Sequence, residues 1–478
     1  MKMIINGKKV DASNKEAIKV INPANGQFID DVPSATKDDI EAAVNYAKIG
    51  QKAWKKQSIY ERSLVMGKFI EAVRKLRDDL AMSLCLETGK IILEAKAEID
   101  VATDIFVNYI EKMKHWYSEV YPIGNDAGNK NHIHFSIREP IGVVASILPF
   151  NFPVILFAFK IAPTLIAGNA ALVKPPSDNP LTVIRLCEML VEAGVPDGAI
   201  QVVTGQGPRV GKWLCENSGI DAISLTGSSS VGISVMESAA KNLTPVALEL
   251  GANDAFVVFD DVDVEFAAND AVACRMFDAG QVCCASKRFV VHNSIKDKFI
   301  EKVVDKVNNL IVGDPVSPNT QIGCLINEKA AQKVEQQVQK TIDQGAKLLC
   351  GGKREGSFYY PTVLADVTPD MDVSKDMEIF GPVMPIIGFD TMEEAIAVVN
   401  ASIYGLSGSV YTNDFKTAMK MAYELESGST IINGVSTYRS MEMPFGGYKM
   451  SGIGNEGVAS TLEEVTQIKN IVMFDVLK

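Results

Sequence analysis

Residues 280–284, Gly-Gln-Val-Cys-Cys, combine residue types whose spacing suits nucleophilic chemistry. A glycine shortly before a cysteine, at the end of a helical pattern, allows a turn that presents the thiol and leaves its backbone N–H free. A thiolate in such a polar, partly exposed position can act as a nucleophile. The alternative is that Cys283 and Cys284 are core cysteines, and the segment taken alone favours this alternative.

A glutamate, Glu249, ends an apolar strand-like run at residues 246–250. Burial at the end of a strand raises the pKa of a carboxyl group, which must then be paired or functional. A carboxylate of this kind can activate water. The alternative is a glutamate at the solvated mouth of a loop.

Residues 149–153, Pro-Phe-Asn-Phe-Pro, place a single amide side chain between two prolines in an apolar stretch. The prolines fix the backbone, so the amide of Asn151 could donate to an oxygen that develops negative charge. A purely structural turn is the alternative.

Two further segments have features of nucleotide binding. Residues 226–228, Thr-Gly-Ser, follow a strand and open a helix, so their backbone N–H groups could face a pyrophosphate. Neither they nor residues 205–208, Gly-Gln-Gly-Pro, match the G-x-G-x-x-G pattern, so each is a weak signal alone. Lys174 and Ser177 follow another strand and place a cation and a hydroxyl where a ribose and a phosphate could bind.

These residues lie between apolar strand-like segments and helix-length segments that alternate along the chain. Such alternation is typical of parallel βαβ units. Thr36 and the Ser58-x-x-Glu61 pattern predict helix starts, and Gly89 predicts a helix end. Residues 130–138 predict one strand of a hairpin, and the tail at 463–474 has strand character. The predicted strands of the central region cover residues 141–148, 170–174, 199–204, 222–225, 246–250, 254–259 and 288–292.

Composition narrows the class of protein. A chain of 478 residues with 47% hydrophobic and 22% charged residues predicts two or three folded domains. The net charge of −12 argues against nucleic acid and against an anionic membrane as partners. Prolines and Lys160 interrupt the apolar stretch 141–173, which we expect to be a buried strand and helix rather than a membrane span.

The eight cysteines form no disulfide framework, and the four histidines are scattered. We therefore expect no metal site. Reduced thiols and the absence of an apolar export segment at the N-terminus predict a cytoplasmic protein.

Taken together and in chain order, these motifs resemble the aldehyde dehydrogenase superfamily over nearly the whole chain. The matching segments are 149–153, 174–175, 226–228, 249–251, 280–283, 378–382 (Glu-Ile-Phe-Gly-Pro), 444–447 (Pro-Phe-Gly-Gly) and 449–452.

The resemblance implies an α/β fold with three parts and assembly as a homodimer or homotetramer. It implies a Rossmann-type dinucleotide-binding domain at 1–118 and 141–250 and an α/β catalytic domain at 251–448. A small β oligomerisation arm would comprise 119–140 and 449–478.

The same resemblance implies roles for individual residues. Cys283 would be the nucleophile, Asn151 would donate to the oxyanion together with the Cys283 backbone N–H, and Glu249 would activate hydrolytic water. The base Glu249 favours hydrolysis over transfer to coenzyme A. A cofactor-independent thioesterase and a non-catalytic protein on this fold are alternatives from other classes.

Cofactor residues follow from the resemblance in the same way. Lys174 would bind the adenosine ribose, Ser228 the pyrophosphate and Glu378 the nicotinamide ribose, with Phe380 nearby. NAD-preferring relatives usually carry an acid at position 177, so Ser177 predicts a preference for NADP, with NAD also used. The full predicted set is Leu148, Pro149, Phe150, Lys174, Ser177, Gly207, Thr226, Gly227, Ser228, Leu250, Glu378 and Phe380. Ala252 departs from the family, which usually has glycine there.

Substrate choice depends on two positions and one arginine. Succinic-semialdehyde members typically carry arginines where this chain has Phe159 and Phe277. An apolar aliphatic or aromatic aldehyde is therefore the first expectation. Arg439 supports the alternative, a lactaldehyde- or glycolaldehyde-type or anionic semialdehyde, unless it is a surface arginine. The predicted pocket comprises Phe152, Leu156, Phe159, Phe277, Arg439 and Phe445.

Overall fold

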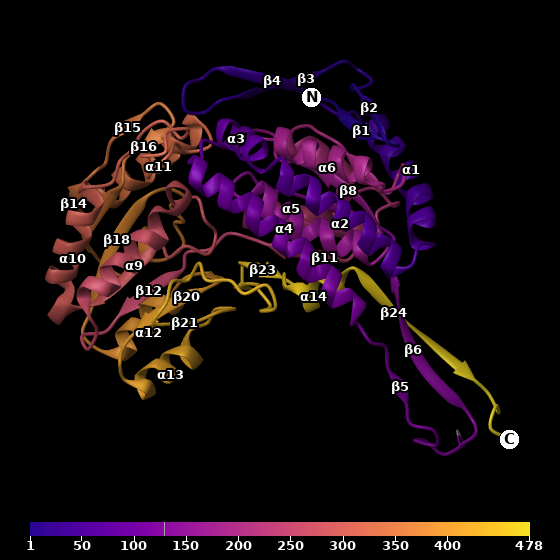
Figure 1. Ribbon diagram of the computed structural model, residues 1–478. Helices are drawn as coiled ribbons and strands as arrows, with labels where there is room; N and C mark the ends of the chain where they lie inside the picture. The colour runs from indigo at the N-terminus through magenta and orange to yellow at the C-terminus, as the bar shows by residue number, and fades with distance from the viewer. Residues whose placement is uncertain (129) are drawn as a thin grey trace.

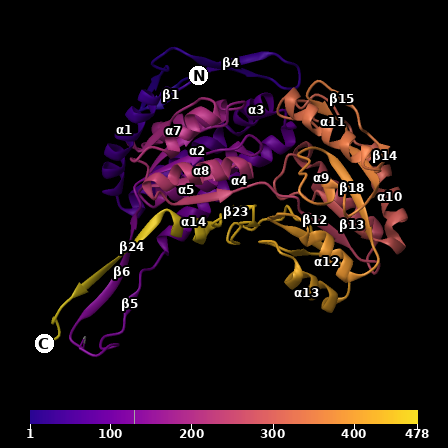
Figure 2. The same cartoon turned by 180° about the vertical axis from the view of Figure 1, so that it is seen from behind.

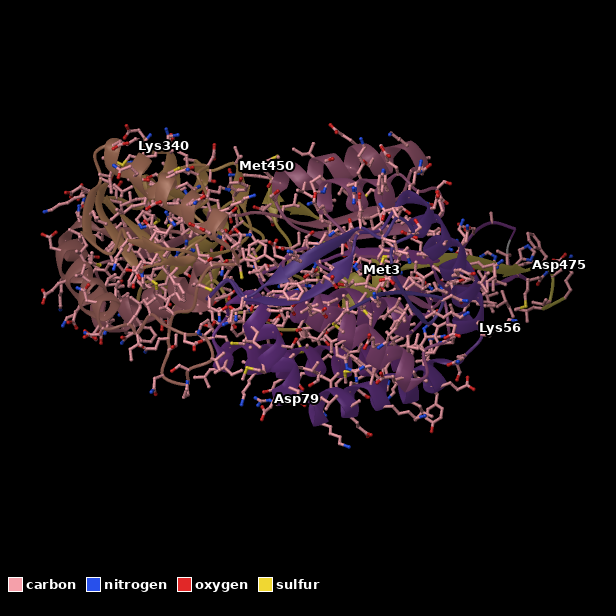
Figure 3. The ribbon with its side chains drawn as sticks, turned by 90° about the horizontal axis from the view of Figure 1, so that it is seen from above. Met3, Lys56, Asp79, Lys340, Met450 and Asp475 are labelled. Atoms are coloured by element: carbon pink, nitrogen blue, oxygen red, sulfur yellow. The ribbon has the colours of Figure 1, made fainter. Side chains whose placement is uncertain are left out.

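Two large β-sheets, each flanked by helices, form the body of the protein, and a narrow arm projects from it (Figure 1). The structure is a computed structural model that describes residues 1–128 and 130–478. The half coloured indigo to magenta carries the first sheet, and the half coloured orange carries the second. Seen from above, Met450 lies at the junction of the two halves and Asp475 at the far end of the arm (Figure 3). The predicted α/β fold is confirmed.

The first sheet has eight strands in the order β2-β1-β9-β8-β7-β10-β11-β23. The five strands from β9 to β11 are parallel, whereas β1, β2 and β23 pair antiparallel. β7 and β8 are buried along their whole length, as expected for strands with helices on both faces. The bounds are β1 Met3–Ile5, β2 Lys8–Val10, β7 Val143–Ile147, β8 Ala170–Lys174, β9 Ile200–Val202, β10 Ala222–Thr226, β11 Val246–Glu249 and β23 Gly452–Ile453.

Helices of the first half begin and end where the sequence predicts. Thr36 and Ser58 each form a capping box with the third helical residue, and Gly89 ends a helix in the left-handed conformation at φ 79°. These helices are α1 Lys37–Lys55, α2 Ile59–Lys75, α3 Arg77–Thr88, α4 Ile92–Lys114, α5 Pro153–Ile166, α6 Leu181–Ala193, α7 Lys212–Cys215, α8 Ser229–Ala239 and α14 Val458–Glu464.

The second sheet has seven strands in the order β14-β17-β18-β13-β12-β20-β21, and only β14 at its edge is antiparallel. Its strands are β12 Ala255–Val258, β13 Arg288–His292, β14 Lys347–Cys350, β17 Thr362–Val367, β18 Val383–Phe389, β20 Gly408–Tyr411 and β21 Ile431–Ile432. The helices of this half are α9 Val264–Met276, α10 Asn293–Asn308, α11 Glu328–Asp343, α12 Met392–Asn400 and α13 Phe415–Glu424. Short strands lie around the body at β3 Ala17–Ile21, β4 Phe28–Pro33, β15 Arg354–Glu355, β16 Phe358–Tyr359, β19 Tyr404–Gly405 and β22 Tyr448–Lys449.

The arm is a three-stranded sheet made from β5 (Val120–Tyr121), β6 (Ile133–Pro140) and β24 (Thr466–Met473). Figure 2 shows it from behind, extending away from both halves. The predicted hairpin and C-terminal strand are confirmed, and they pair antiparallel with Thr466 opposite Pro140.

The three-part division of the chain stays a prediction, and strand pairing adds a detail to it. The resemblance groups residues 449–464 with the arm, but β23 pairs with β11 in the first sheet and α14 packs against α4 and α5.

The apolar stretch 141–173 folds as β7, α5 and most of β8, as the sequence predicts. Within the described residues, no helix combines the length and apolar character that crossing a bilayer requires.

Where the two halves meet, the first sheet contributes loops that follow its strands, and the second sheet contributes loops that precede its strands. β7, β10 and β11 finish at Ile147, Thr226 and Glu249, so the loops after them leave the carboxyl edge of the first sheet. Chain order reverses between β7 and β10, and such a switch point is where open α/β sheets bind ligands. From the second half come loops that lead into strands, ahead of β13 at Arg288 and ahead of β18 at Val383.

Candidate active site

Two cavities share Cys283 and Asn151 in their walls. The wider one, about 440 Å³, lies between the two halves and is called the cofactor cleft below. The narrower one, about 170 Å³, is called the substrate pocket. A thiol at their boundary can meet a molecule in the pocket and another in the cleft at the same time.

The loop that presents Cys283 has an unusual backbone. After α9 ends at Met276, Asp278 and Ala279 adopt positive φ values of 49° and 51°, and Gly280 follows at 78°. A Cβ atom on Gly280 would come within 2.3 Å of the carbonyl group of Gly381, so only glycine fits there. Strained turns of this kind are concentrated at functional sites. The predicted turn before the cysteine is confirmed.

A buried arginine that sequence reasoning missed holds this loop. The Arg275 guanidinium donates to the carbonyl oxygens of Val383 at 2.8 Å and of Ile379 and Gly381. It thereby ties α9, directly before the cysteine loop, to the segment that carries Glu378. The sequence gives no signal for this role, because an arginine at the end of a helix is usually solvated.

Asn151 lies in the loop between β7 and α5, and hydrogen bonds hold both its side chain and its main chain. Its Nδ2 donates to the carbonyl oxygen of Gln281 at 2.8 Å, and the buried Lys90 Nζ donates to the main-chain carbonyl oxygen of Asn151 at 2.8 Å. Lys90 is in turn bound by Glu98 at 2.5 Å. The amide has a second N–H, which can donate to an oxygen bound at Cys283.

The groups around the Cys283 thiol have opposing effects on its pKa. Its interaction with the Cys284 thiol, followed by burial, raises the pKa of Cys283 well above the ordinary value. Positive charge on Lys287 and Arg439 acts in the opposite direction. The thiolate is thus disfavoured by its immediate neighbour and favoured by two cations.

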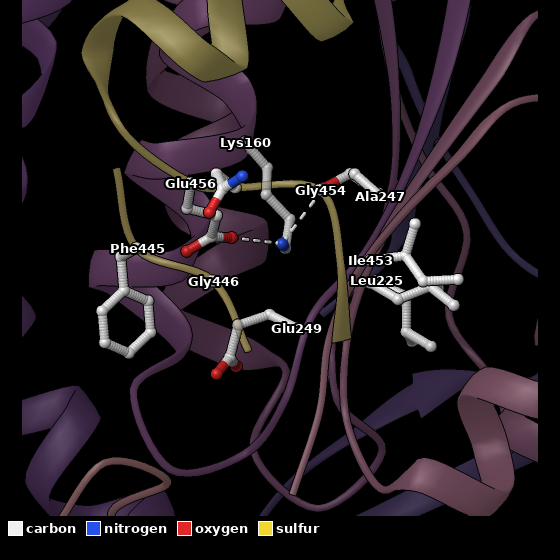
Figure 4. Close-up of a pocket in the computed structure, with 12 residues that line it drawn as sticks. Lys160, Leu225, Ala247, Glu249, Phe445, Gly446, Ile453, Gly454 and Glu456 are labelled. Atoms are coloured by element: carbon white, nitrogen blue, oxygen red, sulfur yellow. Dashed lines mark hydrogen bonds and ion pairs between the residues drawn. The ribbon is translucent and has the colours of Figure 1, made fainter. Parts of the chain in front are cut away.

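Glu249 is a buried carboxyl group at the end of β11. Among the described residues, neither of its oxygens has a hydrogen-bond partner. Burial, reinforced by nearby Cys283 and Glu456, raises its pKa well above the ordinary value. Figure 4 shows Glu249 close to the Lys160–Glu456 pair but not joined to it. The alternative of a solvated loop-mouth glutamate is wrong, because only 5% of the residue is exposed.

Most predicted cofactor residues do line the cleft. The N-terminus of α8 faces it with Ser228 as the N-cap residue, and Glu378 enters from the second half. The Phe150 and Phe380 rings approach edge to face across the cleft at 5.9 Å. Residues of the predicted set on the cleft are Pro149, Phe150, Thr226, Gly227, Ser228, Leu250, Glu378 and Phe380.

The other predicted cofactor residues lie outside the wall of this cavity. Lys174 is buried, and its Nζ donates to the Pro175 carbonyl oxygen at 3.0 Å. Ser177 Oγ donates to the Gly205 carbonyl oxygen at 3.0 Å. Leu148 is buried, and Gly207 begins a short π-helical turn.

Sequence reasoning missed several residues on the cleft. Asp178 follows Ser177 directly, and Asn327 Nδ2 donates to its carboxylate at 3.3 Å across the two halves. The others are Gly251, Gln281, Ile326, Ala330, Lys333, Val334 and Gln337. Those from α11 and the turn before it carry no recognisable motif.

The cleft has the donors and acceptors that a dinucleotide needs. The start of α8 offers backbone N–H groups suited to a pyrophosphate. Glu378 offers carboxylate oxygens suited to ribose hydroxyls. A Cβ on Gly251 would lie 2.8 Å from Glu378 Oε2, so glycine keeps this carboxylate accessible. The residues present therefore fit a nicotinamide dinucleotide.

All predicted substrate residues line the substrate pocket. Phe152, Leu156, Phe159, Phe277, Arg439 and Phe445 surround Cys283 together with Asn151 and other apolar side chains. The structure thus brings together residues from α5, from the cysteine loop and from the loop before Phe445.

Arg439 is held inside this pocket. Its Cζ lies 3.8 Å from the Phe159 ring centroid and 4.3 Å from that of Phe445. Its Nη2 donates to Glu456 at 3.1 Å, and Glu456 also binds Lys160 at 2.6 Å. Its Nε is buried without a partner in the part of the chain that the structure describes. The alternative of a surface arginine is wrong, since 18% of its side chain is exposed.

Comparison with known proteins places this geometry in a family. The model of the aldehyde dehydrogenase family matches residues 9–471. Among curated relatives, 3-sulfolactaldehyde dehydrogenase of Priestia aryabhattai is 39% identical over 458 residues, which cover 96% of this chain and 95% of the relative. Succinate-semialdehyde dehydrogenase [NADP(+)] GabD of Escherichia coli (strain K12) is 38% identical over 469 residues, covering 98% and 96%.

Solved structures agree with these matches. An E. coli NADP dependent enzyme superposes with a TM-score of 0.95 at 37% identity, covering 99% of this chain and 98% of that one. Betaine aldehyde dehydrogenase from Staphylococcus aureus in complex with NAD+ gives 0.95 at 34% identity, covering 100% and 95%. A site of matching residues, a family model over nearly the full length and these relatives together show that the chain belongs to the aldehyde dehydrogenase family.

Proposed function

We propose that this enzyme oxidises an aldehyde to the carboxylic acid with Cys283 as nucleophile, Asn151 as oxyanion donor and Glu249 as base. The observation that carries the proposal is the position of Cys283 and Asn151 on both cavities, with Glu249 on the cofactor cleft beside them. When bound in the cleft, a nicotinamide dinucleotide supplies the hydride acceptor for this oxidation.

The side chains account for the bond changes. The Cys283 thiolate adds to the aldehyde carbon, and the N–H groups of Asn151 and of the Cys283 backbone stabilise the negative oxygen. When the C=O double bond re-forms, the C–H bond breaks and hydrogen leaves with both electrons, which oxidises the carbon to a thioester. Water then adds to the thioester while Glu249 accepts its proton, and the Cys283 thiolate leaves as the acid is released.

The cofactor part of the proposal is a preference for NADP, with NAD also used. Ser177 presents no carboxylate, so it does not repel a 2′-phosphate, and the Lys174 ammonium lies three residues before it. Asp178 acts against this preference, because its carboxylate stands on the cleft beside Ser177. The name of one relative specifies NADP(+), and a solved neighbour contains NAD+.

For the substrate, the pocket favours a short aldehyde with an anionic or hydroxylated far end. The main support is the buried Nε of Arg439, which has no partner among the described residues. A buried donor without an acceptor costs free energy that a ligand oxygen would recover. The named substrates of two relatives, a sulfolactaldehyde and a semialdehyde, have this character. We therefore propose the alternative to the first expectation of an apolar aldehyde.

An apolar aldehyde remains the second candidate because of the aromatic lining. Phe152 and Phe277 pack at 5.5 Å between ring centroids, and Phe159 and Phe445 enclose the arginine. These four rings line the pocket together with one cation, Arg439.

An aldehyde panel distinguishes the two candidates. Initial rates of NAD(P)H formation would be measured with a semialdehyde, a hydroxyaldehyde and an unbranched aldehyde of equal length. Arg439→Met should raise KM for the anionic substrate about 10- to 100-fold, the range for a hydrogen bond to a charged group, and change the unbranched aldehyde much less. Arg354→Met, which removes a distant arginine paired with Glu328 and Glu335, is the matched control. Equal losses on all three aldehydes would refute the role of Arg439, and turnover of esters without any cofactor would favour a thioesterase.

A further inference from the structure

A buried lysine, Lys287, lies directly under the loop that carries the nucleophile. Only 1% of its side chain is exposed. Its Nζ donates to the carbonyl oxygen of Cys283, four residues earlier, and to that of Ala285 at 3.3 Å. Its own backbone N–H donates to the Asp254 carbonyl oxygen at 2.8 Å, which anchors the lysine at the start of β13.

On its other side, the same ammonium reaches the cofactor cleft. Nζ lies 3.3 Å from Glu378 Oε1, and Glu378 lines the cleft with 21% of its side chain exposed. Glu378 Oε1 also accepts the Ala252 backbone N–H at 3.3 Å. An ammonium has three N–H donors, and here they face Cys283, Ala285 and Glu378.

We propose that Lys287 is a positioning residue that holds the Cys283 main chain and links it to Glu378, so that contact of a ligand with Glu378 changes the reactivity of the thiol. This inference rests on the proposed roles of Cys283 and Glu378. It extends them, because it makes the nucleophile respond to occupancy of the cleft through one buried side chain.

The electrostatics of the site support this link. Positive charge on Lys287 lowers the pKa of Cys283, against the raising effects of Cys284 and of burial. The carboxylate of Glu378 partly neutralises that charge. A ligand that hydrogen-bonds to Glu378 spreads the negative charge over its own donors, and Lys287 then acts more strongly on the thiol.

Other titratable groups face the same region, so the variants must be compared at one pH, where the protonation states of these groups are the same. Arg439, on the narrow cavity, lowers the pKa of Cys283, and Cys283 in turn raises the pKa of Glu249 on the wide cavity. Asp254 faces Lys287 from the segment before β12, and burial raises its pKa to about 7. Rates are therefore compared at pH 8, above the pKa of Asp254, and then across a pH series.

The test is the rate at which iodoacetamide alkylates Cys283 without cofactor, with the modified residue identified by mass spectrometry. Lys287→Met should slow alkylation about tenfold at pH 8, because the buried cation that favours the thiolate is gone. Glu378→Gln should accelerate it several-fold, because the ammonium loses its counter-charge. Lys287→Arg keeps the charge and should restore most of the rate lost in Lys287→Met.

The decisive outcome is that Lys287→Met slows alkylation and Glu378→Gln accelerates it. A purely structural role predicts that either substitution slows alkylation or leaves its rate unchanged. If Lys287→Met does not fold, Glu378→Gln alone decides: faster alkylation supports the link, and an unchanged or slower rate overturns it. Lys340→Met, which removes an exposed lysine that pairs with Asp372 outside both cavities, should leave the cofactor-free rate unchanged.

A second arm adds NADP+ or NAD+. Saturating cofactor should change the alkylation rate of the wild-type enzyme, and Lys287→Met and Glu378→Gln should each abolish most of that change. The same response in wild type and both variants would overturn the proposal. Because alkylation needs no turnover, absence of aldehyde oxidation would count against the proposed function and not against this link.

Discussion

The two cavities that meet at Cys283 are built in contrasting ways. The cofactor cleft is wide and carries backbone N–H groups, carboxylates and amides from both halves. The substrate pocket is narrow and is lined by aromatic and aliphatic side chains around one arginine. The cleft is suited to a large, charged ligand, and the pocket is suited to a small one.

The contrast reflects where the residues come from. The first half contributes to the cleft mainly loops directly after β7, β10 and β11, so strand order alone brings them together. The pocket takes residues from α4, α5 and the 437–445 loop, which tertiary packing must bring together. Substitutions at the shared boundary should therefore affect both cavities, whereas substitutions farther away should affect one.

The largest expected effect is at the boundary itself. Cys283→Ser should reduce aldehyde oxidation by at least about 10³-fold, because a serine hydroxyl is a far weaker nucleophile than a thiolate. The cofactor cleft should still bind NAD(P)H, as measured by fluorescence titration, since Cys283 occupies only its edge. Retained oxidation in this variant would remove Cys283 from the mechanism.

The next effect separates the oxidation step from hydrolysis. Glu249→Gln should give a burst of NAD(P)H equal to the enzyme concentration and then a steady rate about 10²-fold lower, because water is no longer activated. An unchanged steady rate would exclude Glu249 as the base.

The pH dependence of Glu249 has a definite sign. Its pKa is raised, so the carboxylate that can accept a proton appears only as pH rises through that raised pKa. Hydrolysis by the wild type should increase over this range, and Glu249→Gln should lack the increase. An ionised carboxylate without partners also destabilises the fold, so this variant should raise Tm more at pH 9 than at pH 6, by thermal denaturation.

The cleft was largely predictable from sequence and the contacts beneath the site were not. Glu249 and Thr226 end apolar strands and Asn151 follows one, and loops at such strand ends converge in a parallel sheet. Arg275 is a buried cation satisfied by carbonyl oxygens far along the chain, and the buried Lys287 pairs with the distant Glu378. No local pattern reveals such partners. The sequence leaves the role of Arg439 open, and its partner Glu456, which lies 17 residues farther along the chain, is visible only in the structure.

The smallest effect concerns the far end of the cleft. Ser177→Glu should weaken NADP binding about tenfold more than NAD binding, because a carboxylate there repels a 2′-phosphate. Asp178→Asn removes a carboxylate instead of adding one, so it should shift the ratio of the two Kd values toward NADP.

Burial lowers the pKa of Lys174 to about 8, so its positive charge is lost as pH rises through that value. The preference of the wild type for NADP should accordingly decline between pH 7 and 9 in equilibrium titrations. A ratio that neither variant changes, and that stays constant with pH, would mean that residues 174–178 do not select the cofactor.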